Sequence, residues 1–188
     1  FRLYDLPEIE PSRLVGFASN RIDRLSEKRQ DDSAFTALEL PETRVMVLGG
    51  NKLLLDYTEE QAPRALFSLG EAQAFSPDLH EPILLGLQDG APIVALMAPL
   101  DPDAIEQPYR AQDYRSIYME GLIPSDIVGA LAQAGALSAW HNNHRFCGRC
   151  GTKSEMRAGG AKRVCPSCHA EHFPRTDPVA IMLPVRGE

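Results

Sequence analysis

All four cysteines of the chain lie within 22 residues, and their spacing constrains the fold more than any other feature of the sequence. They form two C-x-x-C pairs, Cys147 with Cys150 and Cys165 with Cys168, separated by fourteen residues. Each pair can form a tight turn that presents two sulfurs to one metal ion at about 2.3 Å, so two pairs complete a tetrahedron. The pattern therefore predicts a four-cysteine zinc ribbon.

Four thiolates leave no open position for water, so the zinc is expected to be structural. Two disulfides and a thioredoxin-like redox pair are the competing interpretations. The N-terminal residues resemble no secretion signal, which disfavours disulfides and predicts a cytoplasmic location. A redox motif needs one C-x-x-C pair rather than two. His144, His169 and His172 flank the cysteines, so a mixed Cys/His site is conceivable, but four cysteines suffice.

The composition predicts a globular protein without a membrane-spanning segment. Of the 188 residues, 44% are hydrophobic and 24% are charged, which suffices for one core and a small additional module. The most apolar stretch, residues 91–100, is interrupted by Pro92 and Pro99 and is far shorter than the roughly 20 residues of a membrane helix. We therefore expect no membrane association.

The net charge of −7 argues against non-specific binding of nucleic acid by the whole chain. The charge is uneven, however. Residues 144–175 contain seven Lys/Arg and two Glu, whereas the remaining residues contain 12 Lys/Arg and 24 Asp/Glu. The basic segment can offset the charge of its own metal-bound thiolates on a solvated face, or it can bind an anion.

The first hundred or so residues predict a small mixed, largely antiparallel sheet. Apolar runs at 44–48 and 52–56 flank Gly-Gly-Asn and indicate a hairpin. Further apolar runs follow at residues 64–69, 83–87 and 93–97, the last two separated by a turn at 88–92. The polar segment 21–30 has Ile22 and Leu25 at helical spacing and predicts a short surface helix.

A longer helix is predicted immediately before the cysteines. Ser125 is placed to be its N-cap, Asp126 lies in the first turn, and residues 127–141 are rich in Ala and Leu. Its apolar residues lie on all sides, which predicts a connecting helix buried on two sides. We thus expect an α+β protein with a domain at 1–124, a helix at 125–143, a ribbon at 144–175 and a further segment at 176–188.

The two segments at the start and the end of the ribbon resemble those of a known protein family. Residues 140–151 read WHNNHRFCGRCG, and residues 171–181 read EHFPRTDPVAI. They resemble the entry to and the exit from the zinc ribbon of NADH pyrophosphatases, a family of Nudix hydrolases. The resemblance implies that 1–124 is a diverged Nudix-like domain and that 176–188 holds the first strand of a Nudix catalytic domain.

The family implies a function for the longer protein. By resemblance, the longer protein is expected to hydrolyse the pyrophosphate of NAD(H) to nicotinamide mononucleotide and AMP, and to remove NAD caps from RNA. For this reaction it would use Mg²⁺ or Mn²⁺ held by the glutamates of a Nudix box. In these 188 residues no glycine is followed by Glu six positions later, and no Arg-Glu-x-x-Glu-Glu run occurs. The chain is then either a fragment of a longer enzyme or a naturally truncated, non-catalytic relative. We expect the fragment, which would be inactive and without catalytic residues of its own.

Two further residues acquire roles from the resemblance. Phe173 is expected to stack on a base or nicotinamide ring, or else to pack the ribbon against the next domain. Arg175 is expected to bind phosphate, or else to pair with Asp177. We also expect a homodimer, in which the helix and the ribbon could bridge the subunits. The alternative function is a non-catalytic zinc-ribbon module that binds RNA or a protein partner.

Overall fold

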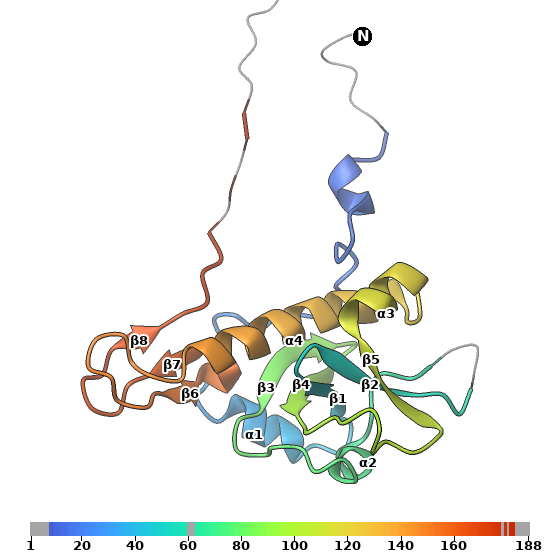
Figure 1. Ribbon diagram of the computed structural model, residues 1–188. Coiled ribbons are helices and arrows are strands. Elements are labelled where there is room, and N and C mark those ends of the chain that lie inside the picture. The colour runs from blue at the N-terminus through green and yellow to red at the C-terminus, as the bar shows by residue number, and fades with distance from the viewer. Residues whose placement is uncertain (1–7, 60–62, 178, 180, 183–188) are drawn as a thin grey trace, which may run out of the picture.

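The computed structural model describes residues 8–59, 63–177, 179 and 181–182. In this part of the chain a five-stranded and a three-stranded sheet are joined by the long helix α4, which confirms the α+β class (Figure 1). The helices are α1 (Ser33–Leu38), α2 (Leu69–Gln73), α3 (Tyr114–Glu120) and α4 (Ser125–Asn143), with 3₁₀ turns η1 (Pro11–Leu14) and η2 (Ala158–Gly160). The strands are β1 (Arg44–Gly49), β2 (Lys52–Asp56), β3 (Ile83–Gln88), β4 (Ala91–Met97), β5 (Tyr109–Asp113), β6 (Glu155–Arg157), β7 (Lys162–Val164) and β8 (Glu171–His172).

The larger sheet has the strand order β3-β4-β1-β2-β5. Three of its four neighbouring pairs are antiparallel, whereas β1 and β4 run parallel. The predicted hairpin is confirmed, because β1 and β2 pair with Leu48 opposite Leu53. The apolar runs at 83–87 and 93–97 correspond to β3 and β4, so most of the predicted sheet is correct.

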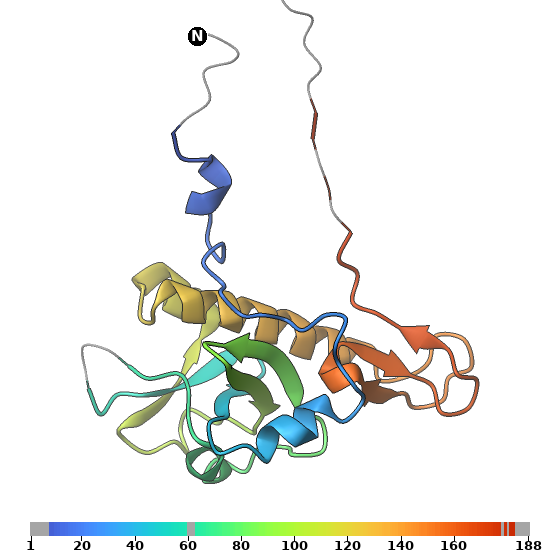
Figure 2. The same cartoon turned by 180° about the vertical axis from the view of Figure 1, so that it is seen from behind.

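The sheet lies between two helical layers. Alternate residues of a strand point to opposite faces. Met46 and Leu48 accordingly pack with residues of α3 and α4, whereas Val45 and Val47 pack with residues of α1 and α2. Helix α4 therefore covers one face of the sheet, and the two short helices cover the other (Figure 1 and Figure 2).

The helix predicted over residues 21–30 is wrong. The segment instead lies along β3, the edge strand of the sheet, where Asp23 and Leu87 exchange backbone hydrogen bonds of 2.8 and 2.9 Å. The guanidinium of Arg29 donates to two more carbonyl oxygens of β3, at 2.7 and 2.9 Å. An edge strand offers unpaired backbone groups, and bonding to them replaces the local bonds of a helix.

The prediction also misplaces one strand. The apolar run 64–69 joins neither sheet as a strand: Arg64 and Phe67 form isolated bridges, and α2 begins at Leu69. The fifth strand is β5, which pairs with β2 over five residues. Its sequence, YRAQD, has no apolar run, so hydrophobic pattern alone does not reveal it.

Helix α4 occupies the predicted range but begins and packs differently. Pro124 rather than Ser125 is the N-cap, with an extended backbone and no side-chain cap. Asp126 in the first turn accepts a hydrogen bond from Gln88 at 2.8 Å. Within the described residues α4 buries one face rather than two, because Ala136 and Ala139 on the other face are exposed. The apolar residues on the exposed face include these alanines, which are small enough to remain in solvent.

We predict that Gly86→Ala lowers the free energy of unfolding by about 3 kcal/mol. Gly86 lies at a bulge of β3 with φ +144°, and a Cβ there would lie 2.1 Å from the backbone oxygen of Asp23. Urea denaturation measures the change. The control is Gly70→Ala in α2, where a Cβ meets open space and stability should stay equal or rise by up to about 1 kcal/mol. Equal effects of the two substitutions would contradict the close approach at Gly86.

Candidate metal centre and the surfaces around it

The four cysteine sulfurs form one compact group. All four Sγ atoms lie within 4.8 Å of one another. The Sγ atoms of Cys147 and Cys168 are 3.6 Å apart, and those of Cys150 and Cys165 are 3.4 Å apart. Tetrahedral thiolates at 2.3 Å from an ion are about 3.8 Å apart, whereas a disulfide needs about 2.05 Å. The geometry therefore fits a single zinc ion and does not fit disulfides.

The two C-x-x-C turns share one backbone pattern. In each turn, the N–H of the residue four positions after the first cysteine donates to the carbonyl of that cysteine. Gly151 donates to Cys147 at 2.8 Å, and His169 donates to Cys165 at 3.0 Å. Both donors have positive φ, +77° and +58°. The two turns thus present their sulfurs in matching ways, as a two-turn metal site requires.

Hydrogen bonds to sulfur favour the thiolate that binds a metal. The backbone N–H of Arg149 donates to Cys147 Sγ at 3.4 Å, and Nε2 of His172 lies 3.4 Å from the same sulfur. These bonds, that of Arg149 foremost, lower the pKa of Cys147 to about 6. Among the described residues the sulfur group includes no histidine, and His144 bonds instead to the carbonyl of Trp140 at 2.8 Å.

The basic residues of the ribbon divide into three groups. One residue, Arg163, is fully buried. Besides Arg163, which pairs with Glu81, three pair with acidic residues: Arg157, Lys162 and Arg175. Three are exposed and form no ion pair within the described residues: Arg145, Arg149 and Lys153. Only these three exposed residues can therefore form the solvated or anion-binding face that the sequence predicts.

Arg163 joins the ribbon to the rest of the chain. Within the ribbon, its guanidinium donates to the carbonyl and to Oγ of Ser154, at 2.7 and 2.9 Å. It also contacts Nδ1 of His141 at the end of α4 and Oε1 of Glu81 in the loop before β3, each at 3.2 Å. A buried charge is tolerated only with such partners. The sequence carries no signal for this contact, since Glu81 lies 82 positions away.

His141 is held neutral at the same junction. Its Nε2 lies 2.8 Å from the carbonyl of Gly160, which can only accept, so Nε2 carries the hydrogen and Nδ1 accepts from Arg163. Burial, together with the charge of Arg163, lowers the pKa of His141 to about 4. At physiological pH the ring is therefore an uncharged link between α4 and the ribbon.

Gly160 in the spacer between the two cysteine pairs brings the ribbon backbone close to the N-terminal domain. Gly160 has φ +87°, and a Cβ there would lie 3.2 Å from the Cα of Ile83 in β3. The N–H of Ala158 donates to Asp31 at 3.1 Å in the segment before α1. The ribbon backbone therefore contacts the N-terminal sheet directly.

The two residues expected to bind substrate lie on the C-terminal side of the ribbon. Phe173 is 60% exposed, and the Arg175 side chain is 90% exposed and paired with Asp177. Both line a groove of about 610 Å³ beside α4, together with Trp140 and Leu137. The structure thus brings Phe173 and Arg175 to one cavity, and it shows the ion pair that was the alternative for Arg175.

Comparison with known families agrees with this arrangement. Residues 42–140, more than half of the chain, match the NADH pyrophosphatase-like rudimentary NUDIX domain. The chain belongs to the NADH pyrophosphatase family. Residues 142–173 match the zinc ribbon domain of NADH pyrophosphatases, which contains all four cysteines.

Individual members of the NADH pyrophosphatase family extend beyond this chain. The NAD-capped RNA hydrolase NudC of Stutzerimonas stutzeri is 36% identical over 104 residues, which are 55% of the chain and 36% of that protein. The human NAD-capped RNA hydrolase NUDT12 is 27% identical over an alignment of 210 positions, which covers 88% of this chain and 45% of that protein. Human mitochondrial NAD(P)H pyrophosphatase NUDT13 is 45% identical over 53 residues, which are 28% of the chain and 15% of that protein. The chain thus spans less than half the length of these relatives.

We predict that Cys165→Ser abolishes stoichiometric zinc binding and unfolds the ribbon. Cys165 is fully buried, and a small ribbon depends on the roughly 10 kcal/mol that a structural zinc contributes. Metal analysis of the purified variant gives the zinc content, and Ser167→Ala in the same turn is the control. One zinc per chain in Cys165→Ser would refute the four-cysteine site.

We predict that stability falls between about pH 6.5 and 4 partly because of His141. Its folded pKa of about 4 lies below the ordinary value of 6.5, so the unfolded chain binds the proton first as pH falls. The contribution is complete above pH 6.5 and is lost as pH falls towards 4. His141→Gln, which can keep both hydrogen bonds, should show a shallower loss in urea titrations with excess zinc. Acid-induced zinc release destabilises the wild type and His141→Gln alike. If the stability of both proteins falls in parallel with pH, His141 has no role in the loss.

Proposed function

We propose that this chain is the zinc-binding N-terminal part of an NADH pyrophosphatase. The longer protein would hydrolyse the pyrophosphate of NAD(H) to nicotinamide mononucleotide and AMP and would remove NAD caps from RNA. The observation that carries the proposal is that two family models adjoin along one chain, at 42–140 and 142–173. The names of two relatives, NAD-capped RNA hydrolases of a bacterium and of human, support the RNA substrate.

The role of this part would be to build and orient a wall of the substrate site. The four cysteines would hold zinc, whose chemistry here is structural, and would fix β7 and β8. Arg163 would then lock the ribbon to α4 and to Glu81, which sets the direction in which the chain leaves at Phe173. An exposed aromatic ring at this position can stack on a flat base or nicotinamide ring.

The chemistry itself would require residues beyond these 188. Hydrolysis of a pyrophosphate needs divalent ions, Mg²⁺ or Mn²⁺, and the glutamates of a Nudix box to hold them. The proposal therefore includes that the chain alone releases no AMP from NADH and that the full-length protein does. Assay of both proteins under the same conditions tests this, and hydrolysis by the chain alone would contradict it.

The assembly and location of the protein belong to the same proposal. We infer a cytoplasmic homodimer. In the described part of the chain no helix is long and apolar enough to cross a membrane. Light scattering of the full-length protein gives the oligomeric state, and a monomer at micromolar concentration would contradict the dimer.

We predict that Phe173→Ala in the full-length protein raises the KM for NADH by about tenfold, which corresponds to one lost stacking contact. The matched control is Phe146→Ala, because Phe146 is an equally exposed phenylalanine of the ribbon, at 65% against 60%. The KM of this control should not change. An unchanged KM in Phe173→Ala would show that the ring only packs the ribbon against its neighbour.

A further inference from the structure

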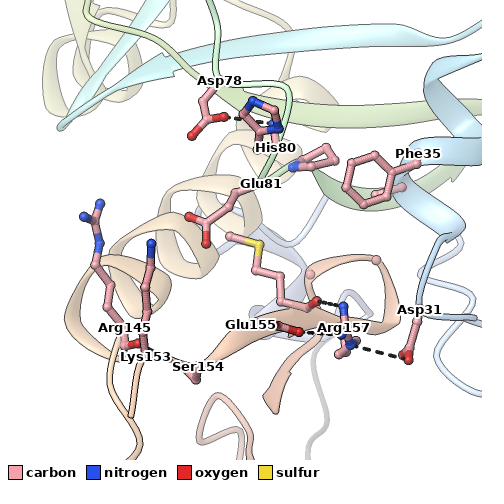
Figure 3. A pocket seen from close by; sticks show the side chains of 15 residues that line it. Asp31, Phe35, Asp78, His80, Glu81, Arg145, Lys153, Ser154, Glu155 and Arg157 are labelled. Atoms are coloured by element: carbon pink, nitrogen blue, oxygen red, sulfur yellow. Dashed lines mark hydrogen bonds and ion pairs between the residues drawn. The ribbon is translucent and has the colours of Figure 1, made fainter. Parts of the chain in front are cut away.

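A second cavity lies at the junction between the N-terminal domain and the ribbon (Figure 3). It measures about 780 Å³ and shares no lining residue with the groove of Phe173. One wall comes from α1 and the loop before β3, and the other comes from the ribbon around β6. The volume falls within the range of small-ligand sites, about 300 to 1,000 Å³.

The ribbon wall presents two cations without acidic partners. Arg145 and Lys153 lie side by side at one edge of the cavity (Figure 3). Within the described residues neither forms an ion pair, and the guanidinium of Arg145 bonds only to Asn142, at 3.1 Å. Arg157, by contrast, pairs with Asp31 at 3.7 Å. The side chains of Arg145 and Lys153 are therefore available to bind a phosphate group.

The opposite wall presents an exposed aromatic ring. Phe35 of α1 is 46% exposed and lies across the cavity from Arg145 and Lys153 (Figure 3). Pro82 and the half-buried Met156 also line the cavity and provide apolar surface. An aromatic ring next to apolar surface binds a flat base by stacking.

Four carboxylates line the cavity: Asp31 and Glu155 pair with Arg157, whereas Asp78 and Glu81 do not. Glu81 already shares a hydrogen bond with Arg163, which keeps its carboxylate in place. Asp78 accepts the backbone N–H of His80 through Oδ1 at 2.8 Å, so its orientation is also fixed. Carboxylate oxygens accept hydrogen bonds from hydroxyl groups such as those of a ribose. They would also repel a ligand that is anionic along its whole length, such as an RNA backbone.

We propose that this cavity binds a nucleoside monophosphate. The phosphate would contact Arg145 and Lys153, the ribose hydroxyls would face Asp78 and Glu81, and the base would stack on Phe35. Because the two walls come from the N-terminal domain and the ribbon, bound nucleotide would stabilise the junction between them. The choice of AMP as the ligand rests on the proposed function, in which AMP is a product. The site would then sense product.

Calorimetric titration of the zinc-loaded chain with AMP tests the proposal. The expected dissociation constant is below about 1 mM. The double variant Arg145→Glu/Lys153→Glu should weaken binding at least about tenfold, and Phe35→Ala should weaken it about fivefold or more. The control Arg21→Glu/Lys28→Glu makes the same change of charge on exposed residues outside the cavity and should bind normally. Zinc content and circular dichroism establish that each variant is folded.

Three outcomes would overturn the proposal. The first is no heat of binding at about 5 mM AMP, well above the expected dissociation constant. The second is unchanged binding in Arg145→Glu/Lys153→Glu, which would place AMP elsewhere. The third is inorganic phosphate binding as tightly as AMP, which would leave a simple anion site. None of these measurements involves hydrolysis, so the site and the proposed enzyme activity can fail independently.

Discussion

The buried guanidinium of Arg163 is the contact on which the arrangement of the two sheets depends. Its hydrogen bonds reach a loop of the N-terminal domain, the end of α4 and the ribbon itself. If the ribbon moved away, the buried guanidinium would lose two partners and the buried ring of His141 would lose its donor. The junction is therefore directional: apolar packing alone would tolerate sliding, whereas a planar donor with fixed acceptors permits one orientation.

The metal centre and the junction support each other through short stretches of chain. Arg163 precedes Cys165 by two residues in the chain, so zinc that holds the cysteine also fixes the strand that carries the arginine. The two cavities share no lining residue. One opens beside the segment that leaves the ribbon, and the other spans the contact between the domains. A ligand in either cavity would therefore act on a different part of the same rigid connection.

Local features of the fold could be predicted from the sequence, and features made by distant partners could not. The cysteine spacing indicated the metal site, and the Gly-Gly-Asn turn and the alanine-rich run indicated the hairpin and α4. The helix prediction for residues 21–30 is wrong because the backbone of this segment bonds to β3. The polar strand β5 is not predicted because it forms by pairing with β2 and has no apolar pattern of its own. The contacts of His141 and Arg163 join residues up to 82 positions apart, and no periodicity reports such pairs. Family resemblance indicated Phe173 and Arg175, whose roles remain proposals.

His169 makes the two turns of the metal site unequal in energy. It occupies in the second turn the left-handed position that Gly151 occupies in the first, and a side chain in that conformation costs roughly 1 to 2 kcal/mol. While metal holds the sulfurs, this cost is carried by the metal–thiolate bonds. The second turn therefore gains about this much energy on leaving its conformation, whereas the first turn, with glycine at that position, does not.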